Sequence, residues 1–250
     1  MSPALLIARK EAGELLLSQR GLAWLMAMTA ALSGFALLLV SNTELSLLDN
    51  AQVVYDMVGI VGALGALLAI VVGIDSTGGE RERGSLVPLL LVPASREAIL
   101  LGKIGGIAIA WAVMHGLALP YLWAVGSTGQ NMVQGAIILA LLGTPAVLGF
   151  GFLGIVLGVR LASARSGLLA GLIVLLLSAS PLLLGPGLRQ SAIGRAFDAV
   201  NPFSSLVNAA DAAIIDSQAI VAQWDHILVA YLWLALTLWL ARAGFRRIVQ

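Results

Sequence analysis

Two glycine-containing strings match nucleotide-binding motifs by letter, but their surroundings argue against that chemistry. The string Gly149-x-Gly151-x-x-Gly154 has the spacing of the dinucleotide fingerprint, in which glycines let a backbone approach a pyrophosphate at a helix N-terminus. It lies inside a long apolar run, so close helix packing is the better interpretation. The string Gly102-Lys103-Ile104 comes nearest to a phosphate loop, but it lacks the hydroxyl that holds magnesium and has Glu97 at the position of the first glycine. We expect no ATP binding through such a loop.

Ionisable residues at membrane depth are the next candidates for chemistry, because they are costly to bury and usually functional. His115 and Asp56 both lie in apolar runs long enough to cross a bilayer. We interpret His115 as a hydrogen-bonding group between helices; the alternative for both residues is a place on a translocation path. Asp225 and His226 open a later apolar run, where an Asp favours a helix N-terminus and a two-residue metal site is the weaker interpretation. The sequence has no cysteine and no paired carboxylates, Ser/His/Asp arrangement or HExxH string, so we expect neither catalysis nor a bound metal.

The most informative polar segment is 75–103, which holds eight of the 27 Asp, Glu, Lys and Arg residues with both signs interleaved. A short apolar cluster, 86–92, follows the charges, and Pro93 closes it. Ser85 is suited to cap a short helix over this cluster, and Ser95 to cap the helix that follows. The segment therefore predicts a charged turn, a short apolar helix and a second helix that enters the membrane. Such a protrusion suits docking into another protein; a solvated loop without a special role is the alternative.

The elements that must position these residues are membrane helices. Hydrophobic residues make up 60% of the 250 positions and charged residues 11%, too few charges for the surface of a soluble domain. An apolar run of about 20 residues spans a hydrocarbon layer of about 30 Å. We predict an all-α integral membrane protein, a single transmembrane domain over 1–250, with six spans at about 21–41, 53–74, 104–125, 134–159, 167–185 and 226–241.

The distribution of Lys and Arg predicts the orientation of these spans. With six spans, one side carries twelve of the fourteen basic residues and the other carries only Arg189 and Arg195. The positive-inside rule then places both termini and the segment 75–103 in the cytoplasm. Residues 3–20, which precede the first span, place Leu5, Ala8 and Leu15 on one stripe, so we predict an amphipathic helix in the membrane interface.

The segment 80–103 resembles the first cytoplasmic loop of ABC-2 type transporter permeases. That loop usually reads E-x-E-x-G-T-L-x-x-L-L-x-x-P-x-x-R-x-x-I-L-x-G-K, and this chain departs from it in placing Ser85 at the Thr and Pro88 within the short helix. The start at 8–11, the six-helix layout and the basic end at 245–247 are also similar to that family. The resemblance implies a coupling helix that contacts an ATPase subunit, with these matching residues: Glu80, Glu82, Arg83, Gly84, Leu86, Leu89, Leu90, Pro93 and Arg96.

The resemblance also implies a division of labour. This chain would be the permease, working with a second copy of itself and two ATPase subunits that bind the ATP and Mg²⁺, in a bacterial cytoplasmic membrane. We expect no cofactor in this chain, and its net charge of +1 gives no reason to expect nucleic acid. The substrate and the direction of transport stay open.

Two other functions stay open from the residues alone: a non-transporting membrane anchor or assembly factor for cofactor maturation of a periplasmic enzyme, and a membrane-embedded enzyme. Asn201-Pro202, with the basic tail after the last span, is similar to permeases of the nitrous-oxide reductase maturation system. The extracytoplasmic segment 186–224 has an alanine-rich stretch, 205–222, that predicts a short surface helix. This segment could meet a substrate or a periplasmic partner, or it could cap the bundle.

Overall fold

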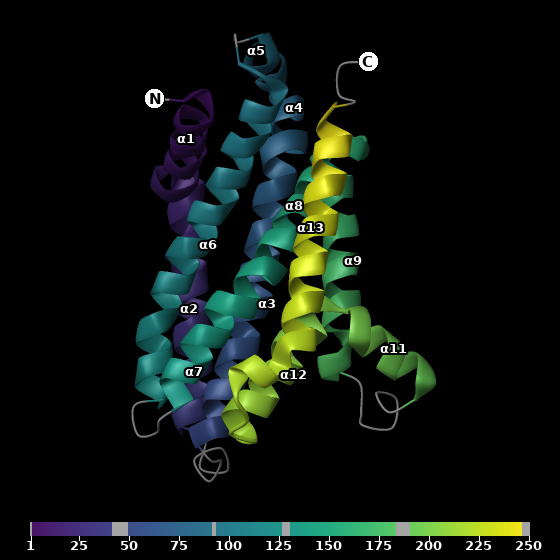
Figure 1. Cartoon of the computed structure of the whole chain (residues 1–250). Coiled ribbons are helices and arrows are strands. Elements are labelled where there is room, and N and C mark those ends of the chain that lie inside the picture. Colours follow the sequence, from purple (N-terminus) through teal and green to yellow (C-terminus); the bar gives the residue numbers. More distant parts are fainter. Residues whose placement is uncertain (1, 42–49, 92–93, 127–130, 184–190, 247–250) are drawn as a thin grey trace.

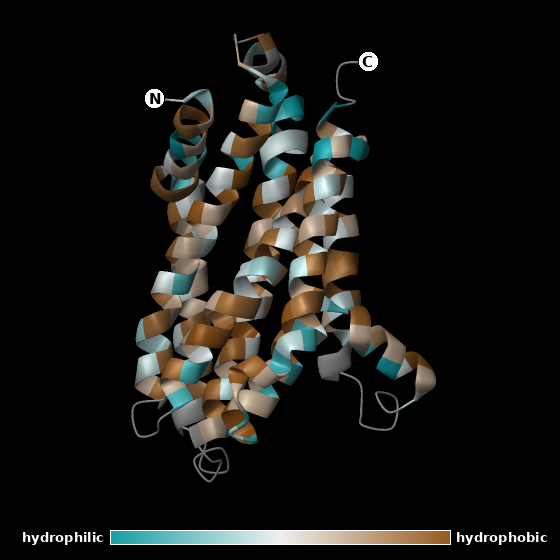
Figure 2. Ribbon diagram, in the orientation of Figure 1, coloured by the Kyte–Doolittle hydropathy of each residue, from teal (hydrophilic) through white to brown (hydrophobic). Residues whose placement is uncertain are grey.

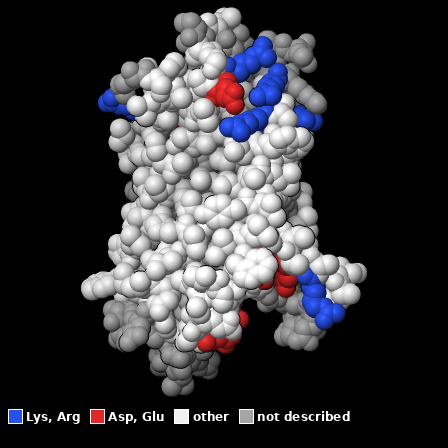
Figure 3. Space-filling view, in the orientation of Figure 1, with Lys and Arg blue, Asp and Glu red and all other residues white. Residues whose placement is uncertain are grey.

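The computed structural model describes residues 2–41, 50–91, 94–126, 131–183 and 191–246, and all the regular elements among them are helices. The helices form an elongated bundle, with α1 and the last turns of α13 at one end and α11 and α12 toward the other (Figure 1). Hydrophilic residues concentrate toward the ends of the bundle (Figure 2). Lys and Arg gather at the end that holds the two termini, and the middle of the face in Figure 3 has no charge. We call this end the basic end. The fold is that of an all-α membrane protein.

Five helical stretches of the described residues are long and apolar enough to cross a membrane: Gly21–Leu38, Ala51–Glu82, Arg96–Val125, Asn131–Arg160 and Ile220–Arg246. They lie in α2 (Gln19–Ser41), in α3 (Asn50–Ile74) with its continuation, in α6 (Arg96–Gly126), in α7 (Asn131–Ile138) with η3 (Leu139–Gly143) and α8 (Thr144–Arg160), and in η5 (Ile220–Gln223) with α13 (Trp224–Arg246). The predicted fifth span, 167–185, overlaps α9 (Ala164–Leu183), but its apolar stretch Ala164–Ser180 is shorter than these five, so five of the six predicted spans are found among the described residues.

The centre of the bundle is a close contact between α3 and α8, made by glycines. A Cβ atom at Gly154 would lie 2.4 Å from the carbonyl oxygen of Ile70, and one at Gly73 would lie 2.1 Å from that of Gly151. Only glycine lets the two backbones approach so closely, which is the usual way that apolar helices gain packing contacts in a membrane. The string that matches the dinucleotide fingerprint is therefore a helix-packing surface, as its apolar context predicted.

The N-terminal helix α1 (Pro3–Leu17) packs along α6, again across glycines. A Cβ atom at Gly102 would lie 2.5 Å from the side chain of Ile7, and one at Gly106 would lie 2.7 Å from that of Glu11. Ala8 and Ala12 are buried in this contact. The predicted apolar stripe is only partly right: Leu5 is exposed, and the acidic Glu11 takes a place on the packed face.

Toward the opposite end, the chain after α9 folds into α11 (Ala192–Val200), α12 (Pro202–Ala210) and η4 (Asp211–Ile215). The predicted surface helix over 205–222 is wrong, because α12 packs against α3, α9 and α13 and almost all its residues are buried. The Asn201-Pro202 pair is the start of this helix: the Asn201 side chain accepts a hydrogen bond from the Phe203 N–H at 3.0 Å and donates one to the Ser178 carbonyl at 2.6 Å.

Candidate functional site

The segment predicted as a charged turn is the continuation of α3. The helix passes through a π-helical turn, η2 (Asp75–Gly79), into the short helix α4 (Glu80–Glu82). Gly84 ends it with φ of 71°, a left-handed conformation that favours glycine, and the Ser85 N–H donates back to the Glu80 carbonyl at 3.0 Å. The Ser85 hydroxyl also donates to this carbonyl, at 3.3 Å, and its predicted cap on the next helix stays a prediction. Residues 80–83, which we call the charged segment, are thus held on a helix end.

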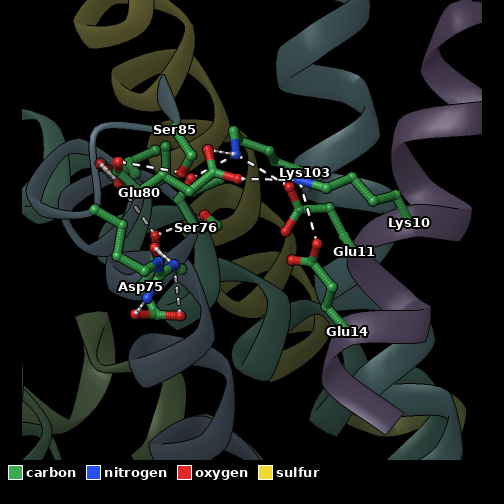
Figure 4. A network of polar contacts seen from close by, with 12 residues as sticks. Lys10, Glu11, Glu14, Asp75, Ser76, Glu80, Ser85 and Lys103 are labelled. Carbon is green, nitrogen blue, oxygen red and sulfur yellow. Dashed lines mark hydrogen bonds and ion pairs between the residues drawn. The ribbon is translucent and has the colours of Figure 1, made fainter. Parts of the chain in front are cut away.

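Glu80 is the first member of a buried ion-pair cluster at the basic end (Figure 4). Lys103 of α6 places its Nζ 2.6 Å from Glu80 Oε2 and 3.1 Å from Glu11 Oε1, and also donates to the Ser76 carbonyl. The side chain of Lys103 is 0% exposed, that of Glu80 5% and that of Glu11 12%. The cluster joins α1, the end of the α3 helix and α6 at one point.

The cluster brings charges of both signs together. Lys10 approaches Glu80 Oε1 at 3.6 Å and Glu14 at 3.5 Å, so two ammonium groups face three carboxylates, one of them mostly exposed. Burial raises the pKa of Glu11 above its usual value, and the positive charge of Lys103 opposes this rise. Removing one partner of such a buried pair leaves an uncompensated charge, so the cluster resists separation of the three elements.

Arg81, the second residue of the charged segment, binds the end of another helix. Its guanidinium donates to the carbonyl of Val159, at 3.3 Å, and to that of Leu161. These carbonyls belong to the last turn of α8, where the helix has no further N–H groups to offer them. A cation at this position also interacts favourably with the negative end of the helix dipole. Arg81 therefore fixes the charged segment to the end of α8.

Glu82 and Arg83 are the last two residues of the charged segment. Glu82 Oε1 accepts a hydrogen bond of 2.7 Å from the N–H of Ala164, the first residue of α9, so an acid sits at a helix N-terminus that it can stabilise. Arg83 forms an ion pair of 2.9 Å with Asp75. The hydrogen bond to Asp75 holds the pKa of Arg83 above its usual value. All four side chains of the charged segment thus interact within the chain. The resemblance implied a docking role for Glu80, Glu82 and Arg83, and their partners within the chain were not predicted.

The short helix α5 (Leu86–Leu91) behaves differently. Leu86 is buried in the wall of a small cavity with Thr77 and Gly158, which anchors the start of the helix. Leu91 at its other end is 80% exposed, and Figure 1 shows α5 beyond the rest of the bundle at the basic end. The side chains of Leu89 and Leu90, and Pro93 as a whole, lie outside the described residues. A short apolar helix therefore projects from a firmly held base.

The helix that follows returns into the bundle with its start capped. Ser95 Oγ accepts a hydrogen bond of 3.1 Å from the Ala98 N–H, as predicted. Arg96 donates to the carbonyl of Arg246 at 3.2 Å, and Glu97 lies 3.5 Å from Arg242. These contacts connect the base of α6 to the last turn of α13, so Arg96 also has a partner within the chain.

The two candidates for a translocation path, Asp56 and His115, lie apart from the charged segment, and each has its own neighbours. Asp56 accepts a hydrogen bond of 3.2 Å from Gln52, one turn earlier on α3. His115 stacks edge-on against Trp111 with ring centroids 5.6 Å apart, and its buried Nδ1 has no protein partner. Within the described ranges, neither belongs to a group of three or more His, Asp or Glu residues that could hold a metal. The structure brings neither residue to the charged segment.

Comparison with known families gives one result over almost the entire chain. The family model described as "ABC-2 family transporter protein" matches residues 5–248. This range includes α1, the cluster around Lys103, the charged segment and α5. A search of curated proteins finds no match. The similarity to nitrous-oxide reductase maturation permeases stays a prediction, since the Asn201-Pro202 pair that suggested it has a local role as a helix start.

Proposed function

Because the chain belongs to the ABC-2 family of transporter proteins, we propose that it couples ATP hydrolysis by a separate ATPase subunit to export of a substrate, with α5 as the coupling helix. The family supports a permease component that associates with an ABC ATPase. The pairing with two ATPases and a second permease copy, and the bacterial inner membrane as its place, are parts of the same proposal. In the positive-inside orientation, α5 and both termini face the cytoplasm, where the ATPase lies.

The observation that carries the proposal is the contrast between the tip and the base of this protrusion. The tip is apolar and exposed at Leu91, which suits insertion into a groove on a partner. The base is fixed by Lys103, by the end of α8 and by the start of α9. A force on α5 would therefore reach α3, α6, α8 and α9 together instead of bending a loose loop. Such rigid transmission is what alternating access by helix movement requires.

The test is co-purification of an ABC ATPase subunit that is expressed together with this chain, through a tag on the permease. We expect Leu91→Asp to remove most of the ATPase, because a carboxylate would be desolvated in an apolar groove. A matched control is Ile193→Asp on α11, which is 84% exposed, against 80% for Leu91, and lies toward the opposite end of the bundle. This control should retain the ATPase in the wild-type ratio.

Equal loss of the ATPase in both variants would point to general damage and would contradict a specific role for α5. Retention in both would show that the ATPase docks elsewhere. Loss with Leu91→Asp alone, together with loss of substrate-dependent ATP hydrolysis in the reconstituted complex, supports the proposal. Retention of hydrolysis without any transport would favour the anchor or assembly factor instead.

A further inference from the structure

A cavity of about 420 Å³ lies between two parts of the bundle at the basic end. One wall is α1 with the first turns of α2, and the other is formed by α3, α6 and α9. The volume falls within the range of about 300–1,000 Å³ that small-molecule sites occupy. It is too small for a whole phospholipid with two acyl chains, and it is separate from the tip of α5.

The deeper part of the cavity is apolar. Its walls there include Trp24 and Met28 of α2, Leu68 of α3, and Met114 and Leu117 of α6. The indole of Trp24 offers a flat apolar face, and the two methionines are flexible side chains that adapt to differently shaped ligands. This part favours a bulky apolar body rather than a sugar or a hydrated ion.

The part nearer the basic end is acidic. Four carboxylates line it, those of Glu11, Glu14, Asp75 and Glu80, with Arg83 as the one basic side chain among the described lining residues. Figure 4 shows Glu11 and Glu14 directed from α1 toward the segment that carries Asp75 and Glu80. Because Lys10 and Lys103 also contact these groups, four carboxylates face three cations, and the one excess negative charge favours a cation over an anion.

The partners of these carboxylates single out Glu14. Glu11 and Glu80 are held by the buried Lys103, and Asp75 by Arg83 at 2.9 Å. Glu14 is 61% exposed and meets Lys10 at 3.5 Å across open surface, a kind of pairing that contributes little. A ligand cation can therefore replace Lys10 at Glu14 with little loss.

We propose that this cavity binds a lipophilic cation, with its apolar body against Trp24 and Met28 and its positive charge at Glu14. The proposal rests on the transporter function proposed above and names the substrate class for it. The acidic part of the cavity lies nearer the basic end than the apolar part, so a lipophilic cation would bind with its charge toward that end and its body deeper in the bundle.

The test uses the permease in nanodiscs, alone and in complex with its ATPase, and two probes of the same size and shape, tetraphenylphosphonium and tetraphenylborate, with binding to empty nanodiscs subtracted. We expect saturable binding of the cation and none of the anion. Glu14→Gln and Trp24→Leu should each weaken cation binding by roughly two- to fivefold. Glu97→Gln is the matched control, because Glu97 also forms a 3.5 Å pair at the basic end and is 55% exposed. It should leave binding unchanged.

Equal binding of both probes, or equal weakening by Glu97→Gln, would overturn the assignment. So would unaltered binding in Glu14→Gln. Binding is measured apart from ATPase recovery, so the two proposals fail separately. A complex that retains its ATPase but takes up no tetraphenylphosphonium rules out only the substrate class. A permease that binds the cation as expected but never recovers the ATPase rules out only the coupling.

Discussion

Residues 80–83 and helix α5 are neighbours in sequence, yet they relate to the rest of the molecule in opposite ways. The charged segment has partners on α6, at the end of α8, at the start of α9 and on η2. Helix α5 is anchored by Leu86 and exposes Leu91 beyond the bundle. The difference teaches that charged residues of a polar loop can be structural: here the charges hold the base, and the exposed residue at the tip is the apolar Leu91.

The variant with the largest expected effect on the base removes Lys103. Lys103→Met leaves Glu11 and Glu80 buried without their cation, which should lower the free energy of unfolding by about 3–5 kcal/mol. The measurement is the apparent melting temperature of the purified protein, followed by size-exclusion chromatography after heating. The triple variant Lys103→Met, Glu11→Gln, Glu80→Gln has no buried charge and should regain part of the loss. Wild-type stability of the single variant would show that the cluster does not hold the base.

Gly84, at the junction of the two regions, gives the next largest effect. Gly84→Ala forces a Cβ into a left-handed conformation and should cost about 1–2 kcal/mol. Because relief of this strain would redirect α5, we expect ATPase recovery to fall as well, with the ion pairs of the charged segment intact. The comparison variant is Gly13→Ala, at an α-helical position with open space around the added Cβ. If Gly84→Ala changed neither stability nor ATPase recovery, the direction of α5 would not be important for ATPase binding.

Glu82→Gln probes one exposed member of the charged segment. The amide keeps a hydrogen-bond acceptor for the Ala164 N–H but loses the negative charge at the start of α9. We expect a loss of roughly 0.5–1 kcal/mol in stability, with ATPase recovery unaffected. If recovery fell while the melting temperature held, Glu82 would belong to the docking surface, as the sequence first suggested.

The smallest effect concerns pH. The pKa of Glu11 is raised in the folded protein by burial, so the folded state binds its proton at a higher pH than the unfolded chain does. Stability should therefore fall as the pH rises from the usual pKa of a glutamate to this raised value. Melting curves across this mildly acidic range should show the slope in the wild type and a smaller one in Glu11→Gln. An unchanged slope would assign the titration to another group.

The sequence predicted the helical class, the approximate spans and the short apolar helix because these depend on local composition and periodicity. It could not predict the partners of the charged segment, since Glu82 and Ala164 are 82 residues apart and meet only through the packing of α3 against α8 and α9. A lysine at the start of an apolar run, such as Lys103, is rarely buried without an acidic partner, which makes Glu80, 23 residues earlier, a candidate. Glu11 is 92 residues from Lys103 and meets it only through the packing of α1 against α6.

The π-helical turn η2 has a consequence for changes in chain length. A π-helical turn holds about one residue more than an α-helical turn, and each residue of an α-helix turns the chain by about 100°. Deleting one residue between Asp75 and Gly79 would therefore restore an α-helical turn and keep the charged segment near its present rotational phase, whereas a deletion in α3 before this turn would rotate it by that angle, away from Lys103, from the end of α8 and from the start of α9 at once. Chain length should therefore vary by one residue more readily at η2 than in the α-helix before it.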